Sequence, residues 1–151
     1  MDATTECLDI MARTLPKEGT TSFLPTTMTQ APEKIGAALK NAAEYMQNNN
    51  RIGQAEIVGI HLEGPFVNPV RKGAQPGEYI LEPSIEQFDE WQTLADDNIK
   101  LVTLAPERKG GYELVHHLAN KGVIASIGHS DADFAEVEQA VQAGASHITH
   151  L

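Results

Sequence analysis

One glutamate and two histidines follow apolar runs, at places where a parallel sheet would bring them together. Glu63 follows the run IVGIHL, His129 follows GVIASIG, and His150 ends a short run that starts at Ser146. One carboxylate and two imidazoles form a donor set that suits a catalytic divalent metal ion. Zinc, iron, cobalt and manganese all accept such a set, so the residues predict a metal site without naming the metal.

The elements that must position these side chains alternate along the chain between short apolar runs and helical patterns. Strands are predicted at residues 21–28, 56–62, 99–105, 123–128 and 146–150. Helices are predicted around Leu8 to Leu15, from Pro32 to Met46, after a capping box at Ser84 and Gln87, around Leu114 to Leu118, and from Phe134 to Gly144. Strict alternation of this kind favours a parallel sheet covered by helices.

Two parallel folds fit this alternation. A doubly wound open sheet usually carries a glycine-rich phosphate turn after its first strand, and the sequence has none. A TIM barrel places its chemistry at the carboxyl ends of several strands, where Glu63, His129 and His150 fall. We therefore predict an α/β fold, a partial TIM (β/α)8 barrel of about five parallel strands, since a whole barrel needs eight strands and about 250 residues.

The alternation of side chains along the second predicted strand separates two faces. Val58, Ile60 and Leu62 would face the helices, while His61 and Glu63 would share the face that lines the barrel. Glu63 then lies at the barrel mouth. The alternative without a function is a solvated glutamate at the end of a strand. His61 lies one layer deeper, and we expect a hydrogen-bonded core histidine that orients the site in preference to a metal ligand.

His129 is a metal-ligand candidate, and the histidines outside the set of Glu63, His129 and His150 are weaker candidates. His129 would lie on the same strand face as Val123, Ala125 and Ile127. Ser130 or Asp131, which follow it, would cap the next helix. A histidine bonded to a loop carbonyl is the structural alternative for His129. His147 would lie on the opposite strand face from His150. His116 and His117 lie in a predicted helix, where one exposed and one partly packed ring is the better interpretation.

Composition excludes several classes of function. The formal net charge is −10, with 21 acidic against 11 basic residues, which disfavours binding to nucleic acid or to acidic membranes. No run approaches the roughly 18 apolar residues of a spanning helix, and the N-terminal residues lack the pattern of a signal peptide. The single cysteine, Cys7, permits no internal disulfide and is expected to be a buried thiol in a cytoplasmic protein.

Five motifs in order closely resemble the N-acetylglucosamine-6-phosphate deacetylases of the amidohydrolase superfamily. They are GTTSFLPTTMT at 19–29, HLEGPF at 61–66, KGAQ at 72–75, GHS at 128–130 and THL at 149–151. The resemblance implies a TIM barrel flanked by a small β domain. It also implies hydrolysis of the small-molecule amino-sugar phosphate N-acetylglucosamine 6-phosphate to glucosamine 6-phosphate and acetate. It further implies that Glu63, His129 and His150 hold one divalent metal ion, and that Ala74 and Gln75 line the sugar site.

The departures from this family pattern limit the expected activity. The family's first HxH strand has no counterpart here, and its acid/base aspartate comes from a later strand, so we name no catalytic residue in this chain. We expect residues 1–151 to be an internal fragment of the catalytic barrel, inactive alone and prone to form homo-oligomers through unpaired strand edges. The alternatives are an amidohydrolase acting on another N-acetyl sugar phosphate, such as N-acetylgalactosamine 6-phosphate, or a non-catalytic metal-binding half-barrel. Arg71 and Lys72 lie near the sugar loop without identifying a phosphate site.

Overall fold

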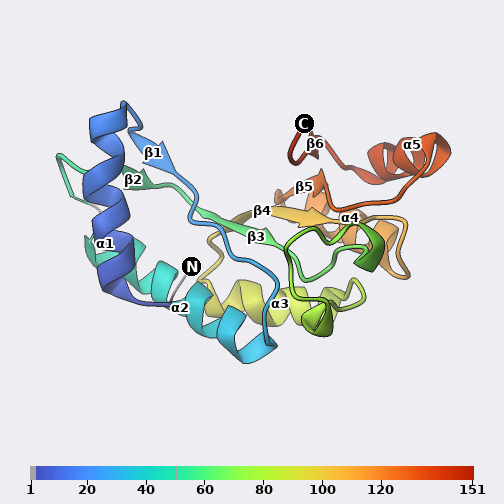
Figure 1. Ribbon diagram of the computed structural model, residues 1–151, viewed down its shortest axis with the longest axis horizontal. Helices are drawn as coiled ribbons and strands as arrows, with labels where there is room; N and C mark the ends of the chain where they lie inside the picture. The colour runs from blue at the N-terminus through green and yellow to red at the C-terminus, as the bar shows by residue number, and fades with distance from the viewer. Residues whose placement is uncertain (1–2, 50) are drawn as a thin grey trace.

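The computed structural model describes residues 3–49 and 51–151, and its strands are short and parallel to their neighbours (Figure 1). Two sheets are formed, β1 (Ser22–Phe23) with β2 (Glu56–Ile57), and β3 (Ile60–Glu63), β4 (Ile99–Leu104), β5 (Ile124–Ile127) and β6 (His147–Ile148) in that order. A bridge between Thr26 and His61 joins the two sheets. Each of the five predicted strand regions contains a strand, and the predicted parallel α/β order is confirmed.

The second predicted strand is interrupted at Gly59, which is why six strands replace five. Gly59 has a φ of 159°, and a Cβ atom built there would lie 2.4 Å from Cγ of Lys100. The register against β4 also shifts between Ile60 and His61. Ile60 and Leu62 are buried as predicted, whereas the prediction for Val58 was wrong, because the interruption leaves its side chain 48% exposed.

Five α-helices follow the predicted regions: α1 (Thr5–Thr14), α2 (Pro32–Asn49), α3 (Ile85–Leu94), α4 (Gly111–Asn120) and α5 (Phe134–Ala143). Short 3-10 turns lie at η1 (Leu15–Glu18), η2 (Pro69–Arg71) and η3 (Gly77–Tyr79). Ser84 caps α3 as predicted, since its side chain accepts from the backbone N–H of Gln87. The cap predicted at Ser130 or Asp131 lies instead at Asp133, which forms a capping box with Glu136.

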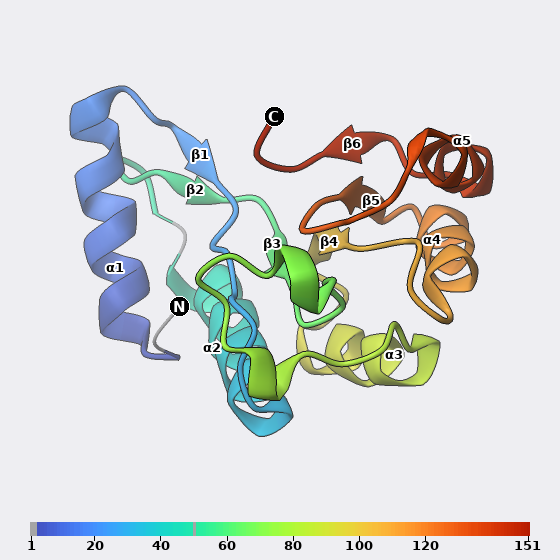
Figure 2. The same ribbon diagram turned by 45° about the vertical axis from the view of Figure 1, so that its right-hand side comes forward.

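The strands form an arc with the helices on its outer side, which is the arrangement of a partial barrel (Figure 2). The core lies between this outer face and the helices, where Leu62, Val102 and Leu104 are fully buried together with Phe88 and Trp91. The inner face of the arc carries polar side chains, including those of His61 and Glu63. Because the apolar side chains pack on the outer face and polar side chains line the inner face, the carboxyl ends of the strands can carry a functional site.

The end of the arc at α5 is less well covered than the middle. In the last helix, α5, Phe134 is 79% and Val141 58% exposed, so the predicted apolar face is not buried as a whole. Ala140 is the buried residue of that helix. The reason is position, since α5 packs beside α4 at one end of the arc (Figure 2).

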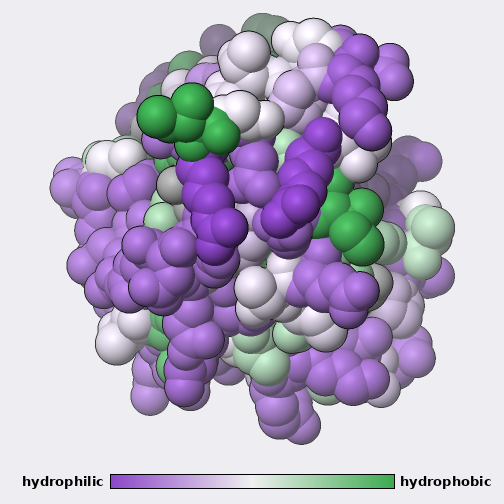
Figure 3. All heavy atoms as spheres, turned by 90° about the vertical axis from the view of Figure 1, so that its left-hand side faces the viewer, coloured by the Kyte–Doolittle hydropathy of each residue, from purple (hydrophilic) through white to green (hydrophobic). Residues whose placement is uncertain are grey.

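The molecular face on the side of α1 is predominantly hydrophilic, with apolar patches that are small and separate (Figure 3). This distribution agrees with the acidic composition of the sequence. Among the described helices, none combines the length and apolar character that crossing a membrane requires.

Candidate metal centre

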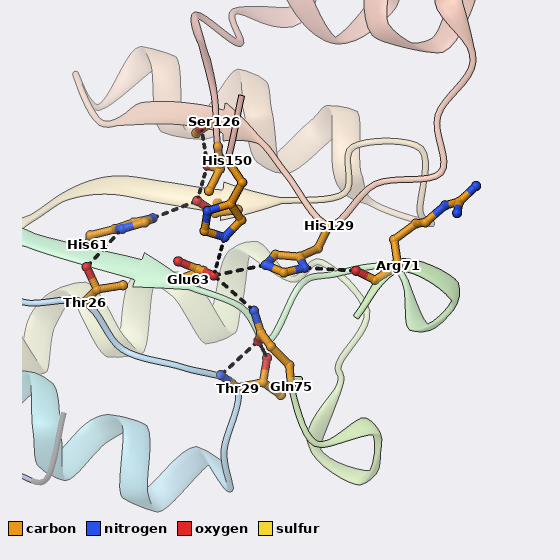
Figure 4. A network of polar contacts seen from close by, with 11 residues as sticks. Thr26, Thr29, His61, Glu63, Arg71, Gln75, Ser126, His129 and His150 are labelled. Atoms are coloured by element: carbon orange, nitrogen blue, oxygen red, sulfur yellow. Dashed lines mark hydrogen bonds and ion pairs between the residues drawn. The ribbon is translucent and has the colours of Figure 1, made fainter. Parts of the chain in front are cut away.

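Glu63, His129 and His150 converge at the carboxyl ends of their strands, on the inner side of the arc (Figure 4). Oε1 of Glu63 lies 3.0 Å from Nε2 of His129 and 3.1 Å from Nε2 of His150. One donor atom from each of the three side chains lies within 4.8 Å of the others. The two imidazole rings meet edge to face, with centroids 5.2 Å apart. Three potential ligands therefore share one small volume.

Both histidines reach this volume through a left-handed backbone. His129 has a φ of 51° and His150 a φ of 61°. Continued strand geometry would send His129 to the outer face with the buried side chains of Ala125 and Ile127. The prediction that His129 continues the strand face was thus wrong, because the backbone turns after β5. Such a conformation costs a non-glycine residue roughly 1–3 kcal/mol and persists where surrounding contacts enforce it.

The ring of His129 is oriented through its second nitrogen. Nδ1 lies 2.9 Å from the backbone carbonyl oxygen of Arg71, and a carbonyl can only accept, so Nδ1–H is the donor. Nε2 is left to face Glu63. A metal-binding histidine characteristically donates its other ring N–H in this way. The guanidinium of Arg71 points elsewhere and pairs with Asp131 at 2.7 Å.

Gln75 lies beside Glu63 and connects it to the segment after β1. Its Nε2 donates to Oε1 of Glu63 at 3.4 Å, and its Oε1 accepts from the backbone N–H and the hydroxyl of Thr29. Gly64 permits this contact, because a Cβ there would lie 2.1 Å from Oγ1 of Thr29. Gln75 is only 2% exposed, so its amide is occupied inside the protein, whereas the neighbouring Ala74 is exposed.

His61 lies beside the three converging residues and belongs to a chain of hydroxyl groups. Its Nδ1 is 3.2 Å from Oγ1 of Thr26, and its Nε2 is 2.7 Å from Oγ1 of Thr103. The chain continues from Thr103 to Thr149 and from Thr149 to Ser126, each step 2.7 Å between hydroxyl oxygens (Figure 4). Thr149 directly precedes His150, so this chain fixes the backbone that carries it.

Burial and hydrogen bonding set the protonation of the two inner groups in different ways. Burial alone would raise the pKa of Glu63, but hydrogen bonds from His129 and His150 outweigh it and lower that pKa. Burial lowers the pKa of His61, against the opposing charge of Glu63. The site therefore favours an ionised Glu63, the state that a carboxylate ligand needs, beside a neutral His61.

The remaining candidates lie away from this volume. His116 is exposed and His117 partly packed on α4, as predicted, and His147 is exposed. Cys7, predicted to be buried, is intermediate in exposure in α1. Asn68 and Glu107 were not predicted as site residues, because the hydrogen bonds that join their loops to the segment around His129 are not visible as a sequence pattern.

The donor set fits a divalent metal ion on its own chemistry. It offers one carboxylate and two imidazole nitrogens, and the Nδ1–H of His129 is already satisfied by protein. Gln75 holds the same Oε1 of Glu63 that faces the two histidines. Three protein ligands of this kind are the pattern of catalytic sites that keep one position for water or substrate.

Comparisons with known proteins agree with this architecture. The profile of the amidohydrolase family matches residues 1–151. An N-acetylglucosamine-6-phosphate deacetylase of Bacillus subtilis (strain 168) is 53% identical over 153 residues, covering 100% of this chain and 38% of that protein. The chain thus spans well under half the length of this relative.

Solved structures give the same result. The N-acetylglucosamine-6-phosphate deacetylase of Pasteurella multocida superposes with a TM-score of 0.88 at 35% identity, over 99% of this chain and 38% of that one. A mutant deacetylase of Mycobacterium smegmatis in complex with N-acetyl-D-glucosamine-6-phosphate gives a TM-score of 0.85 at 28% identity, with the same coverage of 99% and 38%. Because the family profile covers the whole chain, this protein belongs to the amidohydrolase family.

Proposed function

We propose that the whole protein is a metal-dependent deacetylase that hydrolyses N-acetylglucosamine 6-phosphate to glucosamine 6-phosphate and acetate. In this proposal Glu63, His129 and His150 hold one divalent metal ion. The observation that carries the proposal is the convergence of their donor atoms within 4.8 Å at the mouth of a partial barrel. The family relationship supports the choice of an amide as the substrate group.

The chemistry needs a group that activates both water and a poorly electrophilic amide. A bound divalent metal supplies this, because it polarises the carbonyl and lowers the pKa of water. The protein's own residues prepare the site. Glu63 offers a full negative charge, His129 is held by its Nδ1–H bond to Arg71, and Gln75 donates to the carboxylate oxygen that faces the histidines.

Substrate contacts and the acid/base group are separate parts of the proposal. Exposed Ala74, in the loop after β3, stays the candidate that lines the sugar site, while buried Gln75 would act through Glu63. We assign no acid/base residue among the described side chains. Identification of the sugar as the gluco isomer rests on the motif resemblance and on the relative that shares 53% identity.

The extent of the folded unit is also proposed. We infer that residues 1–151 are one section of a larger catalytic barrel, because the arc has fewer strands than the eight that close one. β1 and β6 each pair on one side only, so the isolated section is expected to self-associate. The single Cys7 is consistent with a cytoplasmic location.

Two measurements test the proposal. Isothermal titration with Zn²⁺ or Co²⁺ should give one site per chain that is lost in Glu63→Gln, with the exposed Glu56→Gln as the matched control. Acetate release from N-acetylglucosamine 6-phosphate should require metal in the full-length protein and be undetectable for residues 1–151 alone. A chain that binds no metal contradicts the ligand assignment. A full-length protein that prefers N-acetylgalactosamine 6-phosphate contradicts the substrate assignment.

A further inference from the structure

Glu107, in the loop after β4, joins the loops around His129 without touching the converging side chains. Its Oε1 accepts from Nδ2 of Asn68 at 2.9 Å and from the backbone N–H of Asp131 at 2.8 Å. Its Oε2 accepts from the hydroxyl of Ser130 at 2.7 Å. The donors come from the loops after β3 and β5, so one carboxylate binds together the ends of three neighbouring strands.

These contacts enclose the backbone of His129. Ser130 and Asp131 follow it directly, and the backbone N–H of Asn68 donates to the carbonyl oxygen of His129 at 2.8 Å. The side chain of Asn68 is in turn bound by Glu107. The carboxylate of Glu107 therefore restrains Asn68, which contacts the carbonyl of His129, and also restrains Ser130 and Asp131. The left-handed φ of 51° at His129 is therefore enforced by contacts on the loop and not by a glycine.

We propose that Glu107 is a positioning residue that holds His129 in its left-handed backbone and so aims Nε2 at Glu63. The inference rests on the proposed function in so far as His129 is a metal ligand. The carboxylate acts through hydrogen-bond acceptance, since its three contacts are all with uncharged donors. Removal of the acceptors should free the loop, whereas removal of the charge alone should not.

Two substitutions separate these roles. Glu107→Met keeps the length of the side chain but accepts none of the three hydrogen bonds. Glu107→Gln keeps a carbonyl oxygen for Asn68 and Asp131, and its amide can donate to Ser130, whose hydroxyl can turn to accept. Glu113→Met, at an exposed position on α4, is the matched control for loss of a carboxylate.

We expect Glu107→Met to weaken Co²⁺ binding by about 10- to 100-fold and to change the visible absorption of bound Co²⁺, as disruption of a ligand's hydrogen-bond partners does. Glu107→Gln and Glu113→Met should stay close to the parent protein. A merely electrostatic role would weaken binding equally in the Met and Gln variants of Glu107, and that result would overturn the proposal.

A metal-free measurement keeps this inference separate from the proposed function. The ¹³Cα and ¹³Cβ chemical shifts of His129 report its backbone conformation, and Glu107→Met should remove their left-handed signature while Glu107→Gln retains it. If Glu107→Met fails to fold, Ser130→Ala removes one of the three bonds and should shift the same signals in the same direction. Unchanged His129 shifts in a folded Glu107→Met protein would overturn the proposal, whether or not the parent protein binds metal.

Discussion

Two carboxylates in this protein meet histidines at nearly the same distance but in different surroundings. Oδ1 of Asp89 lies 2.8 Å from Nε2 of His117 and 2.9 Å from Nζ of Lys121, where α3 and α4 meet solvent. Oε1 of Glu63 lies 3.0 Å and 3.1 Å from two imidazoles inside the arc. For both carboxyls burial opposes ionisation, and hydrogen bonds from their partners nonetheless lower the pKa.

The difference lies in what balances the negative charge. Asp89 is paired with a lysine, so its charge is compensated by the protein. The hydrogen bonds described for Glu63 come from His129, His150 and Gln75, and none of these side chains carries a permanent positive charge. A histidine beside a carboxylate is therefore a weak indication of a metal site. Convergence of several donors at strand ends, without a lysine or arginine among the partners, is the stronger one.

The comparison is tested most strongly by neutralising each carboxylate in turn. We expect Glu63→Gln to weaken Co²⁺ binding by more than about 100-fold, beyond the loss typical of a ligand's outer partners, because a charged ligand is removed. Asp89→Asn should leave the affinity unchanged. Isothermal titration measures both constants, and equal losses in the two variants would show that the distinction between these carboxylates is mistaken.

A smaller effect is expected from the hydroxyl that supports His150. Thr149→Val leaves Ser126 without its hydroxyl partner and removes one partner of Thr103, at a cost of about 1–3 kcal/mol in the free energy of unfolding. Co²⁺ affinity should fall about 10-fold, because the backbone before His150 is released. Chemical denaturation and titration check the two values, with exposed Thr14→Val as the control. An unchanged metal affinity would mean that Glu63 alone suffices to place His150.

The smallest effect concerns acid stability at Asp89. Its folded pKa lies below the ordinary value of 3.8, so its ionised form contributes stability above that pH, and this is lost as the pH falls through the lowered folded value. The difference in unfolding free energy between the parent protein and Asp89→Asn should therefore be present at about pH 5 and vanish in stronger acid. Denaturation at a series of pH values tests this sign. Added salt should reduce the difference, since the contact with Lys121 is exposed.

Much of the architecture could be predicted because it depends on local patterns. The alternation of apolar runs and helical faces gave the parallel order, and Ile60 and Leu62 are buried as the strand period requires. The failures occur where a tertiary contact overrides the period. Gly59 interrupts its strand beside Lys100, leaving Val58 exposed, and the cap of α5 lies at Asp133 because Ser130 and Asp131 are bound to Glu107.

By itself the sequence determined which residue types could hold a metal and that they lie at strand ends, because motif, strand period and residue chemistry are local properties. Only the tertiary structure decided how the donors meet. His129 and His150 turn inward through left-handed backbones. Arg71 contacts the ring of His129 through its backbone carbonyl and not through its guanidinium group. Glu107 joins three loops distant in sequence. These features depend on hydrogen bonds between segments far apart in the chain, which no local pattern encodes.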